Sequence, residues 1–217
     1  MRILDSISPA SFVRQIVLLG FFLVPAFDLV RAETDSGNTR PNLIFLLTDD
    51  QRYDSLGCMG NPIISTPHID GMAEDGVIFE KAFVTTAICM TSRASVFTGQ
   101  YAARHGIWNF NVDFTPEQLE NTYLGQLKAA GYRTGFIGKW GVGHPDSAGA
   151  VLDYKGGFPG QSRYFEGDVE KKQGRHLTAK MGDQAIEFLD GCEAGQPFHL
   201  SVSFKAPHCQ DSNQIHA

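Results

Sequence analysis

The chain has 217 residues and a formal net charge of −6, with 42% hydrophobic and 19% charged residues. This composition is typical of one globular domain with a sizeable core, and it excludes a disordered chain. The acidic balance excludes a general electrostatic attraction to nucleic acid or anionic membranes, so an anionic ligand would need local positive groups.

The first 32 residues have the pattern of a secretory signal peptide. A positively charged start precedes the apolar run 16–24, and a small-residue cleavage site ends at Ala32. A membrane anchor is the alternative, but Pro25 and Asp28 interrupt a run already shorter than the ~20 apolar residues of a spanning helix. We therefore expect cleavage after Ala32, no stable membrane anchor, and export to a periplasmic, extracellular or other secretory compartment.

The folded domain is expected to begin after a short polar stretch. Residues 33–40 predict a flexible segment, and we assign 41–217 to the domain. Leu43 to Leu47 is a continuous apolar run without alternation, which indicates a strand buried on both faces of a parallel sheet.

Further strand and helix patterns alternate along the chain. Apolar runs predict strands at 77–83, 133–137 and 198–204. Capping residues and terminal glycines around apolar stripes predict helices at 66–76, 92–99, 121–131 and 178–189. The last helix has an expected buried stripe of Met181, Ala185, Ile186 and Leu189. This alternation predicts an α/β fold, with a mixed, mostly parallel sheet and helices on both faces.

Polar side chains follow three of the predicted strands. Asp49 and Asp50 follow the first strand, Lys139 follows the strand at 133–137, and His208 follows the last strand. Because ligands of such sheets bind at the carboxyl ends of the strands, we expect these groups at one edge. Lys205 is expected to face solvent.

Two adjacent aspartates after a buried strand can bind a hard divalent cation such as calcium or magnesium through oxygen ligands. The alternative for Asp49 and Asp50 is a helix cap or a solvated turn. For His208, the alternative is an ordinary histidine after a strand.

The stretch from Cys89 to Gly99 has the composition of an anion site. It places a thiol, hydroxyl groups and Arg93 at the start of a short apolar helix. Unpaired backbone N–H groups and the helix dipole would point toward Cys89, and a guanidinium suits sulfate or phosphate oxygens. The alternatives are a surface position for Arg93, and for Cys89 a small buried side chain or one of the two disulfides that four cysteines allow in an exported protein.

These stretches resemble the sulfatase family. The resemblance covers Pro41 to His208 and rests on the first strand with its two aspartates, the stretch from Cys89, Gly135–Gly141, and Ser203–His208. It implies the sulfatase or alkaline-phosphatase-like fold and hydrolysis of sulfate esters of small molecules or polysaccharides.

The resemblance also implies residue roles. A formylglycine-generating enzyme would oxidise Cys89 to formylglycine, which becomes the nucleophile and a metal ligand. Asp49 and Asp50 would bind calcium. Arg93 and Lys139 would hold the nucleophile and the sulfate, and His208 would bind sulfate or protonate the leaving group.

Three features depart from the family pattern. Thr91 stands where the modifying enzyme favours proline or alanine, and Gly141 stands where a histidine is expected. His144 is the nearby histidine that could replace it, with a solvated loop position as the alternative. Sulfatases are generally much longer, so we expect a fold truncated on its C-terminal side, with a 41–217 domain that is incomplete.

Two other functions stay open at this point. One is a phosphodiesterase or phosphonate monoester hydrolase, because sulfate and phosphate share tetrahedral geometry. The other is a non-catalytic relative that acts as a binding domain.

Overall fold

The computed structural model describes residues 40–167 and 171–209. The predicted signal peptide and nearly all of the predicted flexible segment lie outside the described residues. Within the described ranges, no helix has the length and apolar character needed to cross a membrane.

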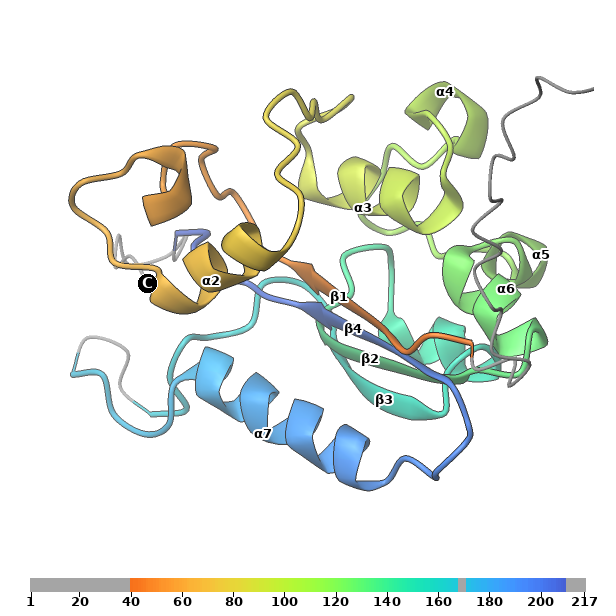
Figure 1. The fold of residues 1–217 in the computed structure, drawn as a ribbon. Coiled ribbons are helices and arrows are strands. Elements are labelled where there is room, and N and C mark those ends of the chain that lie inside the picture. Colours follow the sequence, from red (N-terminus) through yellow and green to blue (C-terminus); the bar gives the residue numbers. More distant parts are fainter. Residues whose placement is uncertain (1–39, 168–170, 210–217) are drawn as a thin grey trace, which may run out of the picture. The chain divides into compact units, whose positions relative to one another are not determined.

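The centre of the fold is a parallel sheet of four strands in the order β1-β4-β2-β3 (Figure 1). The strands are β1 (Leu43–Leu47), β2 (Arg133–Lys139), β3 (Tyr154–Phe158) and β4 (Phe198–Ser203). The predicted parallel α/β architecture is therefore confirmed. The strand predicted at 77–83 is wrong, because this apolar segment is irregular and largely exposed.

The helices are η1 (Gly57–Met59), α2 (Pro67–Asp75), α3 (Cys89–Thr98), α4 (Ala102–His105), α5 (Pro116–Glu120), α6 (Tyr123–Ala129), η2 (Pro145–Ala150) and α7 (Leu177–Asp190). The predicted caps of α2, Thr66 and Gly76, are confirmed. By contrast, α3 begins at Cys89 rather than near Ser92, which puts the cysteine in the first helical turn.

Helices cover both faces of the sheet, as predicted. Adjacent residues of β2 point to opposite faces, so Phe136 packs with Phe97 and Trp140 near α3 while Ile137 packs with residues of α7. Figure 1 shows α7 along one face, with α3 and α6 on the other.

Two expectations about burial differ from the structure. Of the stripe expected in α7, Met181 is buried and Ala185 and Leu189 pack partly buried against the core, but Ile186 is 58% exposed and Phe188 is buried instead. In β1, the predicted burial on both faces fails, because within the described residues this strand has β4 as its one neighbour and leaves Ile44 and Leu46 exposed.

Candidate active site

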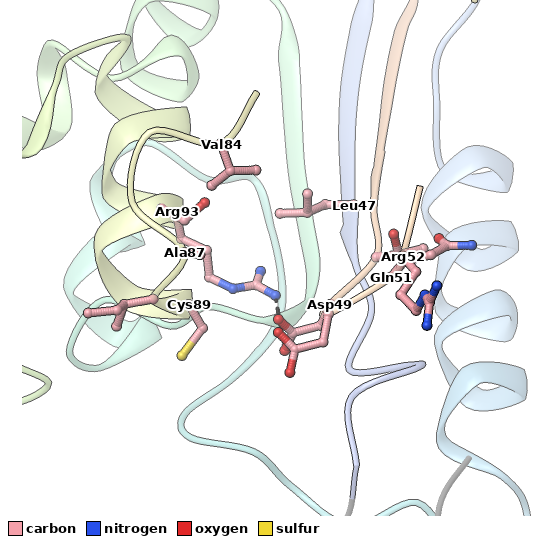
Figure 2. A pocket seen from close by; sticks show the side chains of 12 residues that line it. Leu47, Asp49, Gln51, Arg52, Val84, Ala87, Cys89 and Arg93 are labelled. Carbon is pink, nitrogen blue, oxygen red and sulfur yellow. Dashed lines mark ion pairs between the residues drawn. The ribbon is translucent and has the colours of Figure 1, made fainter. Parts of the chain in front are cut away.

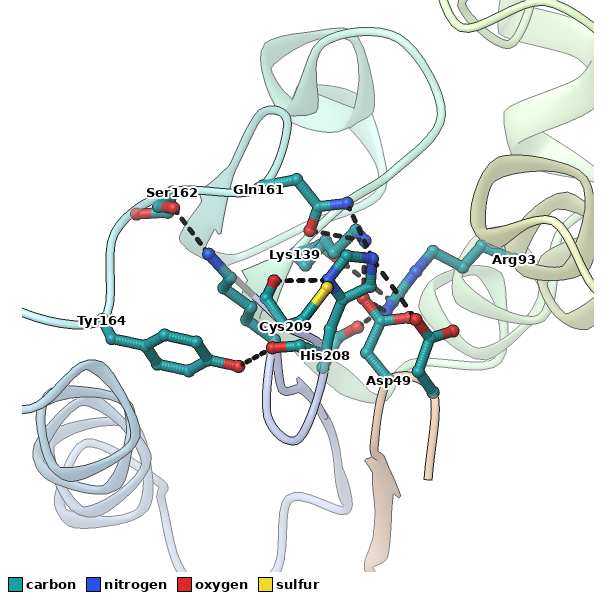
Figure 3. Close-up of polar contacts among 11 residues, drawn as sticks. Asp49, Arg93, Lys139, Gln161, Ser162, Tyr164, His208 and Cys209 are labelled. Carbon is teal, nitrogen blue, oxygen red and sulfur yellow. Dashed lines mark hydrogen bonds and ion pairs between the residues drawn. The ribbon is translucent and has the colours of Figure 1, made fainter. Parts of the chain in front are cut away.

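Three strand ends meet at the carboxyl edge of the sheet, as predicted. Asp49 follows β1, Lys139 is the last residue of β2, and His208 lies beyond β4. The Nζ of Lys139 lies 2.5 Å from Oδ2 of Asp49, and Nη2 of Arg93 lies 3.5 Å from the same oxygen (Figure 3). The helix α3 therefore joins the strand ends through its arginine.

This cluster is buried and carries an excess of positive charge. Asp49, Lys139 and Arg93 are each no more than 6% exposed. Burial lowers the pKa of the Arg93 guanidinium, and the nearby carboxylate of Asp49 opposes that shift. One carboxylate facing two cations leaves a net positive charge, and such a site favours an additional anion.

Arg93 connects α3 to two strands. Its Nη1 donates to the backbone oxygen of Lys139 at 3.1 Å and to the hydroxyl of Ser203 in β4. Its Nε is buried and has no hydrogen-bond partner among the described residues. The alternative of a surface position for Arg93 is therefore wrong.

Cys89 lies at the first position of α3, half-buried, with a free thiol. Cys58, Cys89 and Cys192 have free thiols, so the disulfide alternative for Cys89 finds no support. The residue lines two pockets, of about 470 Å³ and about 510 Å³. The first is also lined by Asp50 and by Asp49 and Arg93, the last two of which Figure 2 shows beside Cys89, and the second is lined by Lys139.

The two aspartates differ in exposure and contacts. Asp49 is fixed by its backbone N–H, which donates to the oxygen of Ala206 at 3.1 Å, and its carboxylate faces Lys139 and Arg93. Asp50 adopts a positive φ of 57°, and its side chain is 66% exposed. Two carboxylates on one pocket with Cys89 are hard oxygen donors that suit calcium. Among the described residues, however, no group of three or more acidic, histidine or cysteine side chains is clustered for a metal.

His208 is held by several polar contacts. Its Nε2 lies 3.4 Å from Oδ2 of Asp50 and 3.3 Å from Nε2 of Gln161, and its Nδ1 lies 2.7 Å from the oxygen of Cys209. The oxygen of the Gln161 side chain accepts from Lys139 at 2.9 Å. Sequence reasoning missed Gln161 because the strand before its loop, β3, contains two glycines and was not recognised.

Lys205 was expected to face solvent, and that expectation is wrong. It is 1% exposed, its Nζ donates to the oxygen of Ser162 at 2.9 Å, and it lies 4.5 Å from the ring centroid of Tyr164. The backbone carbonyl and the aromatic face stabilise the buried charge, so Lys205 secures the loop that carries Gln161.

The glycine at position 141 has a structural reason. Gly141 has a φ of 79°, and a Cβ there would lie 2.4 Å from Cδ of Arg93. A histidine at this position would collide with the buried arginine. His144 lines the second pocket together with Cys89 and Lys139, but its side chain is 57% exposed and it caps η2 by accepting from the N–H of Asp146 at 3.4 Å.

Comparisons with known proteins identify one family. The sulfatase family model matches residues 41–217. The chain is similar to an N-acetylglucosamine-6-O-sulfatase of Bacteroides thetaiotaomicron, with 32% identity over 178 residues that cover 78% of this chain and 31% of the relative. It is also similar to a ulvan-active sulfatase of Formosa agariphila, with 30% identity over 213 residues, 90% of this chain and 41% of the relative.

The fold is also similar to solved structures. One, in complex with its substrate D-glucosamine-2-N,6-O-disulfate, superposes with a TM-score of 0.65 and 28% identity over 78% of this chain and 35% of that chain. A phosphonate monoester hydrolase of Agrobacterium radiobacter has the same fold, with a TM-score of 0.59 and 20% identity over 78% of this chain and 41% of that chain. The chain spans less than half the length of the curated relatives it matches.

The contact between Gly141 and Arg93 makes a testable prediction. Gly141→Ala should lower the free energy of unfolding more than Gly195→Ala, measured by urea denaturation. Both glycines have similar positive φ values, 79° and 84°, but a Cβ at Gly195 would meet no atom of the described residues within 4 Å. The shared backbone strain costs about 1–2 kcal/mol, and the collision at position 141 adds about 1–3 kcal/mol. Equal losses in the two variants would contradict the packing of Arg93 against Gly141.

Proposed function

The chain belongs to the sulfatase family, and on this basis we propose that the complete protein hydrolyses sulfate esters. The observation that carries the proposal is the buried excess of positive charge beside Cys89 at the start of α3. Backbone N–H groups of the first helical turn add to it, because the first N–H groups of a helix have no acceptor within the helix and lie at the positive end of the helix dipole.

We propose sulfated carbohydrates as the main substrate class, with aryl and alkyl sulfates as alternatives. Two relatives are named for action on sulfated sugars, an N-acetylglucosamine-6-O-sulfatase and a ulvan-active sulfatase. Two similar solved structures were determined with D-glucosamine-2-N,6-O-disulfate and with a neocarrahexaose. An arylsulfatase of Clostridium perfringens, 39% identical over 211 residues, supports the aryl alternative.

The proposed nucleophile is a formylglycine made from Cys89 by a formylglycine-generating enzyme. Its hydrated aldehyde supplies two hydroxyls on one carbon, so that one can attack sulfur and deprotonation of the other can release sulfate. A half-buried free thiol that lines both pockets is a suitable position for such a group.

The side chains around Cys89 have distinct proposed roles. Arg93 and Lys139 hold the sulfate and the nucleophile through their positive charge. Asp49 and Asp50, with the modified Cys89, hold a calcium ion, which would neutralise sulfate charge. His208 serves the sulfate or the leaving group, since an imidazole can bind an anion or transfer a proton near neutral pH.

The remaining sequence predictions are kept as proposals. Residues 1–32 are a cleaved signal peptide, 33–40 are a flexible segment, and 41–217 form the N-terminal part of the catalytic domain. The protein is therefore proposed to act after export, in a periplasmic, extracellular or other secretory compartment.

Activity should depend on a divalent cation held by Asp50. The full-length protein should release sulfate from a sulfated monosaccharide, and a calcium chelator should abolish this activity. Asp50→Asn should lose both the bound cation and the activity. Asp75→Asn, at the exposed end of α2, is the matched control and should keep both. Chelator-insensitive sulfate release would contradict the metal assignment.

Faster cleavage of a phosphodiester than of any sulfate ester would favour the phosphodiesterase alternative.

Cys89 should carry the modification when the protein is made beside a competent formylglycine-generating enzyme. The tryptic peptide from Ala82 to Arg93 should contain an aldehyde in place of the thiol, detected by mass spectrometry and by hydrazide labelling. Thr91→Pro should raise the converted fraction, because the modifying enzyme favours proline at this position. The helix should tolerate the change, since Thr91 is in the first turn of α3.

Cys89→Ala is the matched control for that experiment. It should abolish sulfate release and leave the thermal unfolding of the domain nearly unchanged, because the thiol is only half-buried. Recovery of unmodified Cys89 alone would refute the nucleophile assignment and favour the interpretation as a binding domain.

A further inference from the structure

One side chain outside the predicted set, Gln161, joins two of the proposed site residues. Its Oε1 lies 2.9 Å from Nζ of Lys139, and its Nε2 lies 3.3 Å from Nε2 of His208. Figure 3 shows the amide placed between these two side chains. Gln161 therefore connects the end of β2 to the turn that follows β4.

The direction of each hydrogen bond in this connection is fixed by chemistry. An ammonium can only donate, so Lys139 must face the amide oxygen of Gln161, and the amide NH₂ must face His208. On the other side of the ring, Nδ1 of His208 lies 2.7 Å from the backbone oxygen of Cys209, which can only accept. Both contacts suit a neutral imidazole with its proton on Nδ1 and a lone pair on Nε2.

The loop that carries Gln161 is attached to the same turn at two further points. Lys205 donates to the backbone oxygen of Ser162 at 2.9 Å, and the hydroxyl of Tyr164 donates to the backbone oxygen of His208. These contacts limit the freedom of the loop, so the amide of Gln161 has a fixed position from which to orient its two partners.

We propose that Gln161 is a positioning residue that couples Lys139 to His208 and keeps Nε2 of His208 as a hydrogen-bond acceptor. The catalytic consequence rests on the proposed function. With its ring held in one orientation, His208 stays in place for the role proposed above, which is to serve the sulfate or the leaving group.

The carboxylate of Asp50 favours the opposite tautomer of His208, with the proton on Nε2. Its Oδ2 lies 3.4 Å from the same Nε2 and can only accept a hydrogen bond. The carboxylate is 66% exposed, so water competes for it and weakens its effect on the ring. The amide of Gln161, in contrast, has one orientation that satisfies Lys139, and this orientation presents a donor to His208.

The first test reads the ring of His208 directly and needs no catalysis. Long-range ¹H–¹⁵N NMR of the chain should show Nδ1 protonated and Nε2 unprotonated. Gln161→Leu should move the Nε2 resonance, because the ring loses its donor. Gln126→Leu, the same change at an exposed position of α6, should leave it in place. A protonated Nε2 in the neutral ring, or no shift in Gln161→Leu, would overturn the proposal.

The second test asks whether Gln161 acts through His208 in the full-length enzyme. Gln161→Leu should lower kcat about tenfold or more, as is typical of partners that orient functional side chains, with a small change in KM. The same substitution should cause little further loss in a His208→Asn background. If the two substitutions lowered kcat independently, so that their effects multiplied in the double variant, the coupling would be overturned. An enzyme without sulfatase activity would refute the proposed function, and the NMR result would still decide the role of Gln161.

Discussion

The site depends on one buried carboxylate that faces two buried cations. Asp49 lies 2.5 Å from the ammonium of Lys139 and 3.5 Å from the guanidinium of Arg93. Burying ions costs several kcal/mol each, and the arrangement is tolerated only when charges are paired and hydrogen bonds are satisfied. The pairing joins β1, β2 and α3, which are far apart in the sequence, so the positive site beside Cys89 exists only once the sheet has formed.

The surplus charge of this cluster explains how an acidic protein can hold an anion. The whole chain has a formal net charge of −6, yet the buried group contributes two positive charges against one negative charge. At short range in a poorly solvated site, these local charges outweigh a distributed surface charge that water and salt screen. The packing around Arg93 preserves the surplus, because Gly141 leaves the room that the arginine fills.

Much of the sheet and of the central cluster was predictable from sequence, for a physical reason. Apolar runs such as that of β1 mark parallel strands, and polar residues directly after such strands meet at one edge. This rule found Asp49, Lys139 and His208. The rule missed Gln161, because the glycine-rich β3 that precedes it does not have the pattern of a strand. It missed Lys205, because the burial of a lysine by a carbonyl and an aromatic ring depends on tertiary packing. At 77–83 the rule made the opposite error and predicted a strand where the chain is irregular, because apolar composition alone does not provide a neighbouring strand.

We expect Asp49 to compensate the charges of Lys139 and Arg93 whether or not a cation is bound. The most direct test compares the free energy of unfolding of Asp49→Asn and Asp50→Asn in chelator-treated protein. Removing the buried carboxylate should cost about 3–5 kcal/mol, because two buried cations lose their partner. The exposed Asp50→Asn substitution should change stability by no more than about 0.5 kcal/mol. Equal effects of the two substitutions would contradict this role of Asp49.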